Sequence, residues 1–222
     1  GELVLEADAT AARYVGVGTV GSGDLEWPQC ALCHEDKADG WAGTGHATMF
    51  SEAIDGLKSS HYNEGCIGCH TVGFDTAPGA VNDGFDDVAA MVGWTFPEEL
   101  VPGNWEAMDP ALQAKANIQC ENCHGPGSQH FGRTSQAEIA VSTSSGDCAQ
   151  CHDEEPYHSK NQEWNNSRHA VATRYPTGEN RGSCVRCHSG IGFINTVKGG
   201  DEVRTDYEVM VCAACHDPQA IQ

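Results

Sequence analysis

All twelve cysteines of this 222-residue chain belong to one repeated pattern, Cys-x-x-Cys-His, which occurs six times. We number these pentapeptides as boxes 1 to 6 in chain order. Because no cysteine is left over, the six boxes constrain the fold more than any other feature of the sequence. The paired cysteines are Cys30 and Cys33, Cys66 and Cys69, Cys120 and Cys123, Cys148 and Cys151, Cys184 and Cys187, and Cys212 and Cys215.

The spacing within each box is that of c-type haem attachment. Two thiols on a tight turn add to the two vinyl groups of one porphyrin, and the following His is directed at its iron. Zinc sites, disulfides and thioredoxin-like pairs also use paired cysteines, but none of them needs a His directly after the second Cys. We therefore expect six covalently bound haem c groups. The expected proximal ligands are His34, His70, His124, His152, His188 and His216.

The composition agrees with haem as part of the interior. Only 39% of the residues are apolar and 7% are aromatic, which is little for a core made of side chains alone. Each porphyrin supplies a large apolar surface that the chain needs only to wrap. We expect mostly coil with short α-helices and little β structure, wrapped around a continuous stack of six haems.

Local patterns predict a few regular elements within this coil. An apolar stripe that includes Met49, Phe50, Ile54 and Leu57 predicts an inward-facing helix, and an Asp-Pro pair predicts a helix start. Alternation of apolar and polar residues predicts short strands. The expected elements are an amphipathic helix at 46–58, a helix that starts at Asp109-Pro110 and runs to Ile118, and strands at 14–20 and 203–211.

Five histidines lie outside the boxes: His46, His61, His130, His158 and His169. Each iron needs a sixth ligand or an open face, and imidazole is a common choice, so we expect all five to be distal ligands. Two of them share the frame Trp-x-x-[Thr/Ser]-x-His-Ala, at 41–47 and 164–170. In these frames Thr44 or Ser167 is expected to cap a helix that starts near the His.

The histidine count leaves one ligand position unfilled. Six irons with two imidazoles each need twelve histidines, and the chain has eleven. At least one iron therefore has a Met, a water, another donor or an open position. His130 and His158 each follow a box histidine by six residues, which span at most about 20 Å. Since that barely reaches round a porphyrin edge, we expect both to bind a neighbouring haem.

The spacing of the boxes predicts an internal duplication within a single hexahaem domain, 1–222. The boxes start at 30, 66 and 120 and again at 148, 184 and 212, so the first step is 36 residues in both triplets. We expect trihaem units at about 27–130 and 145–222, the first with an insertion at about 74–118. Within that insertion, the acidic stretch 82–87 is a candidate calcium site, although a solvated turn fits its pattern better.

The charge distribution excludes several partners. With 12 Lys and Arg against 32 Asp and Glu, the net charge is −20, which argues against nucleic acids and anionic lipid surfaces. No apolar run approaches the roughly 18–20 residues of a membrane span. The chain opens at Gly1 without the charged and apolar regions of a signal peptide, so if the protein is exported, its signal has been removed.

Some stretches resemble known families. The run Cys120-Glu-Asn-Cys-His-Gly-Pro-Gly-Ser-x-His130 and the two Trp frames resemble multihaem cytochromes related to the tetrahaem electron acceptor of hydroxylamine oxidation and to octahaem reductases. The stretch from His70 to Phe74 and the long insertion are more similar to outer-surface (OmcS-type) cytochromes that polymerise into extracellular nanowires.

The resemblance spans roughly residues 27–217. It implies distal-ligand positions at His46, His130 and His169, and a fold of coil and short helices around a continuous haem chain. It also implies an extracellular or periplasmic location, because such haems are attached outside the cytoplasmic membrane.

Three functions fit the sequence. The first is an electron conduit without substrate chemistry, either a filament built by stacking identical subunits or a monomeric periplasmic shuttle, serving redox partners or an external electron acceptor. The second is a reductase of a small nitrogen or sulfur oxyanion, with catalysis at the haem whose iron lacks a second imidazole. The net charge of −20 argues against it, because it repels anionic substrates. The third is a structural or metal-storage protein. We expect an electron-transfer protein rather than an enzyme, most simply the filament subunit.

Overall fold

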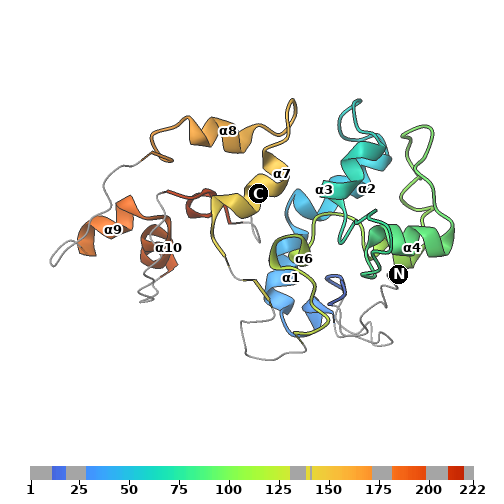
Figure 1. Cartoon of the computed structure of the whole chain (residues 1–222), viewed down its shortest axis with the longest axis horizontal. Coiled ribbons are helices and arrows are strands. Elements are labelled where there is room, and N and C mark those ends of the chain that lie inside the picture. Colours follow the sequence, from blue (N-terminus) through green and yellow to red (C-terminus); the bar gives the residue numbers. More distant parts are fainter. Residues whose placement is uncertain are drawn as a thin grey trace, which may run out of the picture. The chain divides into compact units, whose positions relative to one another are not determined.

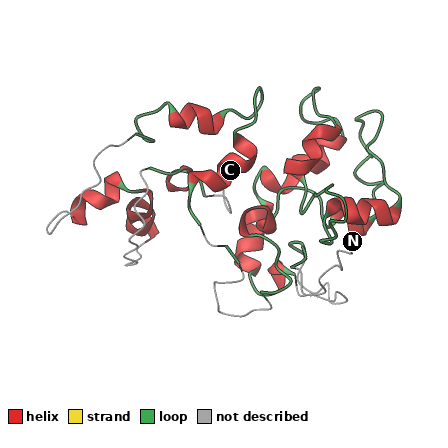
Figure 2. Cartoon of the chain, viewed as in Figure 1, coloured by secondary structure: helices red, strands yellow, loops and turns green. Residues whose placement is uncertain are grey.

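The computed structural model describes residues 12–18, 29–130, 139–140, 142–171, 182–198 and 210–217. Within these ranges the chain forms short helices joined by loops, and Figure 2 shows no strand among them. The expected fold class, coil with short helices and little β structure, is confirmed. The chain divides into two compact units, residues 1–141 with 219–222 and residues 142–218, which we call the N-terminal and C-terminal units.

The N-terminal unit carries boxes 1 to 3. Its longest α-helices have eight residues, so none could be stable without tertiary packing. The α-helices are α1 (Glu35–Ala42), α2 (Met49–Ile54), α3 (Ile67–His70), α4 (Phe85–Val92), α5 (Pro110–Gln113) and α6 (Cys120–His124), shown in Figure 1. The 3₁₀ turns are η1 (Cys30–Leu32), η2 (His46–Thr48) and η3 (Glu64–Cys66).

The C-terminal unit carries boxes 4 to 6. Its helices are α7 (Ser145–His152), α8 (Lys160–Asn165), α9 (Gly182–His188), α10 (Gly190–Lys198) and the 3₁₀ turn η5 (Cys212–Ala214). Helices α9 and α10 pack against each other (Figure 1). A Cβ atom on Gly192 would come within 2.5 Å of Val185, so this close approach requires glycine.

The predicted insertion forms most of the apolar core of the N-terminal unit. Its residues Phe85 and Leu112 pack with Phe50 of α2, and all three side chains are at most 1% exposed. The rings of Phe50 and Phe85 lie 5.3 Å apart at 63°, and Trp94 meets Phe85 edge-on at 5.3 Å. Burying each of these side chains stabilises the unit by about 1.5–3 kcal/mol.

Hydrogen bonds fasten α2 to the insertion at both ends. At its start, the Asn117 Oδ1 atom accepts the N–H groups of Phe50 (2.8 Å) and Ser51 (3.1 Å). After its end, the Asp55 carboxylate accepts the Trp105 N–H at 2.8 Å. Asn117 has a φ of 67°, a left-handed conformation that Asn tolerates better than most residues. The helix is therefore capped from a segment far away in the sequence.

The helical predictions are partly right. The predicted helix at 46–58 is the turn η2 followed by α2, which ends at Ile54. Phe50 and Ile54 are buried as expected, but Leu57 lies beyond the helix and is 66% exposed, so its inward position was wrong. Asp109 is confirmed as an N-cap that accepts the Ala111 N–H at 2.8 Å. That helix ends at Gln113, well short of Ile118.

The predicted strand at 14–20 is wrong for residues 14–18, which form no strand. Three of their N–H groups bind side chains instead of a neighbouring strand: Val15 and Gly16 donate to Glu121, and Val17 donates to Gln119. We call residues 12–18 the N-terminal strap. Residues 19–20, and 203–209 of the second predicted strand, lie outside the described residues, while 210–211 are not in a strand.

The described residues of the C-terminal unit include few buried apolar side chains. These are Val211 and Ala214. Across the part of the chain that the structure describes, no helix has both the length and the apolar character of a membrane span.

Candidate functional site

Every box adopts a helical turn. Boxes 1 and 6 lie on 3₁₀ turns, and boxes 2 to 5 lie wholly or mainly on α-helices. On a helical turn, residues three apart lie on the same face, so the two cysteines of each box can meet one porphyrin. None of the twelve cysteines is in a disulfide, and all are at least partly exposed. The boxes therefore have the local geometry that thioether attachment needs.

Boxes 1 and 3 lie next to each other. The Cys30 and Cys120 thiols share a hydrogen bond. This bond is the main cause of the raised pKa of the Cys30 thiol, and burial is the second cause. The rings of His34 and His130 lie 6.4 Å apart at 20°. Two imidazoles that bind one metal from opposite sides, each at about 2 Å, have ring centres roughly 6 Å apart. This pair thus has the spacing of two axial ligands, supplied by chain segments far apart in the sequence.

The surroundings of the Nδ1 atoms of two histidines near these boxes are compatible with iron binding by the rings. The His130 Nδ1 atom is buried and has no hydrogen-bond partner in the polypeptide. The His124 Nδ1 atom lies 2.6 Å from the Ala140 carbonyl oxygen, which can only accept, so the proton sits on Nδ1. This arrangement leaves Nε2 of His124 as the bare nitrogen, as an iron-binding imidazole requires.

An aromatic ladder leads from the core to box 2. Trp94 contacts Phe96, and Phe96 contacts Tyr62, each with ring centres 6.3 Å apart. Tyr62 stacks on His70 at 5.3 Å and 8°, and His70 is only 7% exposed. Burial raises the pKa of the Tyr62 phenol, whose oxygen has no hydrogen-bond partner in the polypeptide. The insertion thereby fixes the orientation of the His70 ring.

Box 3 is tied to both other boxes of the N-terminal unit. Its Asn122 donates to the carbonyl of Thr71, the residue after box 2, at 2.8 Å. Its Glu121 carboxylate accepts the N–H groups of Val15 and Gly16 in the N-terminal strap. The strap in turn accepts the N–H groups of box 1, with Ala31 donating to the Val17 carbonyl at 2.9 Å.

The two Trp frames make the same contact in their respective units. Trp41 donates its indole N–H to the Ile118 carbonyl at 2.7 Å, and Trp164 donates to the Met210 carbonyl at 2.9 Å. Each acceptor lies two residues before the first cysteine of the third box in its unit. The recurrence of the frame in the sequence hinted at this contact, but the identity of its partner was missed.

The expected capping role differs between the frames. Thr44 does not cap, because its hydroxyl donates backward to the Trp41 carbonyl at 2.7 Å and η2 has no side-chain cap. Ser167 accepts the His169 N–H at 3.2 Å, without a helix beginning there. His46 is half-buried, and burial lowers its pKa, which favours the neutral, metal-binding form of the ring.

The other predicted ligands occupy looser surroundings. His158 lies 5.9 Å from His152 of box 4, but its N–H donates to the Glu154 carbonyl and closes the loop between them. A closed loop does not pass round a porphyrin, so their closeness does not make them ligands of one iron. His61 is exposed and contacts the Ser59 hydroxyl. His169, His188 and His216 are also exposed.

Three methionines differ in how exposed they are. Met108 is 5% exposed within the core, and Met49 packs against that core. Both therefore act as fillers. Met91 is 73% exposed on α4.

The acidic stretch 82–87 forms a hydrogen-bonded turn. The Asp87 carboxylate accepts the N–H groups of Asn82 (2.7 Å) and Asp83 (2.9 Å), and Asp83 pairs with Arg13 at 2.8 Å. Among the described residues, no group of three or more His, Cys, Asp or Glu side chains is arranged to hold a metal ion.

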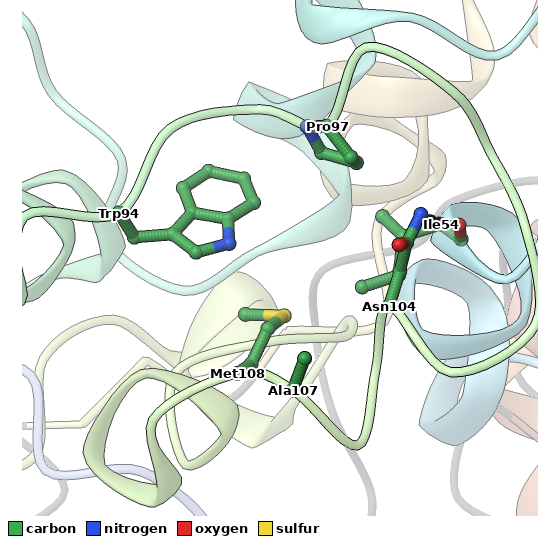
Figure 3. Close-up of a pocket in the computed structure, with 6 residues that line it drawn as sticks. All are labelled: Ile54, Trp94, Pro97, Asn104, Ala107 and Met108. Carbon is green, nitrogen blue, oxygen red and sulfur yellow. Dashed lines mark hydrogen bonds between the residues drawn. The ribbon is translucent and has the colours of Figure 1, made fainter.

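A small pocket lies beside the core. Its volume is about 160 Å³, and Figure 3 shows Trp94, Pro97 and Met108 around it, with Ile54, Asn104 and Ala107. The Asn104 side-chain amide donates hydrogen bonds to the carbonyls of Ile54 and Glu99. None of the predicted site residues lines this pocket.

Comparisons with known proteins support the haem interpretation. Residues 29–93, which include boxes 1 and 2, match the family model of cytochrome c554 and c-prime. The multiheme cytochrome MtrA of Shewanella baltica (strain OS185) is 29% identical over 132 residues, which cover 54% of this chain and 34% of that protein. The chain thus spans about a third of the length of this curated relative. No solved structure matches it. Both matches are to cytochromes, and together with the six attachment motifs they support a multihaem c-type cytochrome.

Proposed function

We propose that the protein carries six haem c groups and conducts electrons over distance as a subunit of an extracellular filament. The observation that carries the conduit is the closeness of box 1 to the segment of box 3. The ring of His34 lies 6.4 Å from that of His130, six residues after box 3, and the strap that accepts N–H groups of box 1 also donates to Glu121 of box 3. Haems attached to boxes in contact have neighbouring edges, and electron transfer requires such closeness. Each bound haem supplies an iron that cycles between the ferric and ferrous states.

The axial ligands of the haem attached through box 1, which we call haem 1, are part of this proposal. His34 is the proximal ligand, and His130 is the distal one, because their rings have the spacing of two imidazoles on one metal. His130 then serves a haem other than the one attached at its own box. The remaining proposed distal ligands are His46, His61, His158 and His169.

We also propose that the two units are copies of one trihaem unit. The matched hydrogen bonds from Trp41 and Trp164 support this duplication, since each ties the frame to the third box of its own unit. The division of the chain near residue 142 agrees with the boundary between the two triplets of boxes.

The proposal places the protein outside the cytoplasmic membrane, where haem c is attached, with redox partners or an external acceptor at its ends. The similarity to OmcS-type filament cytochromes and the net charge of −20, which suits a soluble exterior, support this part. Calcium is not included, because the carboxylates of the 82–87 turn already accept backbone N–H groups.

The eleven histidines keep a reductase as the second candidate, because they leave one iron without a second imidazole. The intact mass of the purified protein gives the number of haems, and low-temperature EPR of the oxidised protein gives their spin states. Six haems without any ligand-sensitive high-spin iron support the conduit. High-spin iron, about one-sixth of the total, that shifts on adding nitrite, hydroxylamine or cyanide supports the reductase.

Electron microscopy of the same sample tests the filament. Regular fibres whose thickness matches single stacked subunits support it. Dispersed particles at high protein concentration contradict the filament and favour the monomeric shuttle.

A further inference from the structure

A buried carboxylate lies between the two cysteines of box 3. Glu121 is 3% exposed, and its oxygens accept the N–H groups of Val15 (2.9 and 3.1 Å), Gly16 (2.7 Å) and Gly127 (2.7 Å). All of these partners are donors, and an acceptor-only carboxylate is the ionised form. The polypeptide thus holds a negative charge inside a haem-attachment motif.

Packing alone does not require this charge. The residue after the first cysteine is buried in all three boxes of the N-terminal unit: Ala31 and Ile67 are each 3% exposed, like Glu121. Among all six boxes, only box 3 has an ionisable residue at this position. An apolar side chain docks the box elsewhere, so the carboxylate does something that docking does not.

The strap links Glu121 directly to box 1: Gly16 donates its N–H to Glu121, and the Gly16 and Val17 carbonyls accept the N–H groups of Cys30 (3.4 Å) and Ala31 (2.9 Å). The pKa of the Cys30 thiol is raised mainly by its hydrogen bond with Cys120 and by burial, and the Glu121 charge adds to the rise. A second buried charge is close by. Lys115 is 9% exposed and donates to the Tyr14 carbonyl in the strap; burial lowers its pKa, and Glu121 opposes that change.

We propose that Glu121 is a fixed charge that lowers the reduction potentials of the haems attached through boxes 1 and 3. A ferric haem carries one more positive charge than a ferrous one, so a nearby anion favours the ferric state. The effect is strong because a buried charge is poorly screened. This inference rests on the haem attachment proposed above.

The test is a spectroelectrochemical titration of the haem-loaded protein and its Glu121→Gln variant. Glutamine has nearly the same shape and keeps an acceptor oxygen but removes the charge. We expect two of the redox components to move to higher potential while the others stay in place. A tenfold change in the ratio of reduced to oxidised iron at fixed potential corresponds to about 59 mV for a one-electron couple. A Glu121→Gln variant whose components all keep their potentials overturns the proposal.

Two further variants separate charge from structural damage. Glu35→Gln removes a carboxylate that directly follows box 1 but is exposed, so its effect on the potentials should be much smaller. Lys115→Met removes a buried positive charge, and it should lower the two components that Glu121→Gln raises. Shifts of the same sign in both buried-charge variants indicate structural loosening and overturn the proposal.

The haem count distinguishes the two levels of the argument. A wild-type mass with fewer than six haems contradicts the proposed function. Six haems with unmoved potentials in the variants overturn only the role of Glu121. Where the Glu121→Gln chain does not accumulate, the direction of the Lys115→Met shift decides: a fall supports the fixed-charge role, and any other result overturns it.

Discussion

Replacing His130 with Ala tests the proposed axial pair of haem 1. The change removes the imidazole that lies 6.4 Å from His34 while leaving the backbone hydrogen bond from residue 130 to the Gly127 carbonyl (3.0 Å). Alanine has no donor for a metal, so the iron at box 1 should lose one axial ligand and keep the other. We expect a change from low-spin to high-spin iron at one haem only.

The expected size follows from the number of boxes. One iron in six should gain a high-spin ferric EPR signal and become able to bind cyanide or carbon monoxide. The potential of that haem should rise, since an imidazole ligand that stabilises the ferric state is lost. The polypeptide should remain folded, because His130 is not part of the apolar core cluster.

A variant that lacks haem 1 identifies which haem has changed. In a protein that lacks haem 1 through Cys30→Ala and Cys33→Ala, the His130→Ala change should add no further high-spin iron. If a new high-spin signal appears in that background, His130 serves another haem and the assignment from ring geometry is refuted. Circular dichroism and the haem count of the five-haem parent check that its remaining sites are intact.

Three further predictions concern stability. Trp41→Phe and Trp164→Phe each leave one backbone carbonyl without its donor and should each cost about 1–3 kcal/mol of unfolding free energy, measured by denaturant titration; a loss confined to one unit argues against equivalent roles. Phe50→Ala should cost about 3–5 kcal/mol and lower the melting temperature, because it empties the centre of the core; a cost below about 1 kcal/mol means that this core is not formed. The hydrogen bond from Lys58, 2.5 Å from the Glu52 carboxylate, lowers the pKa of Glu52 below its usual 4.5, so the pair stabilises the fold above that value and the contribution is lost as the pH falls through the lowered pKa. Because the pair is partly exposed, Glu52→Gln should remove less than about 1 kcal/mol at pH 7 and little at pH 3, and an equal effect at both values contradicts the ion pair.

Features that depend on neighbouring residues were predictable from the sequence. The Cys-x-x-Cys-His spacing needs only a turn, and all six boxes are on helical turns. The Asp109-Pro110 helix start is also local, because the cap and its acceptor are two residues apart. These predictions succeeded because the physical cause lies within one turn of chain.

Features that depend on distant residues were not predictable. The alternating pattern of the strap suggests a strand, but its N–H groups meet Glu121 and Gln119 more than 100 residues away. The inward face predicted for Leu57 assumed a helix that continues past Ile54, whereas Asp55 turns to bind the Trp105 N–H. In both cases a long-range hydrogen bond outweighs the local periodicity.

The contact between boxes 1 and 3 was not predictable either, because chain order suggests that consecutive boxes are neighbours. The signal that could have revealed it lies in the residues that the pattern leaves unspecified. In boxes 1 to 3 the residue after the first cysteine faces the protein and is buried, whether it is Ala31, Ile67 or Glu121. A charged residue at a buried position needs partners. Since box 3 itself offers none, Glu121 already indicated that another segment must supply the backbone donors, and the strap that does so is the segment that also binds box 1.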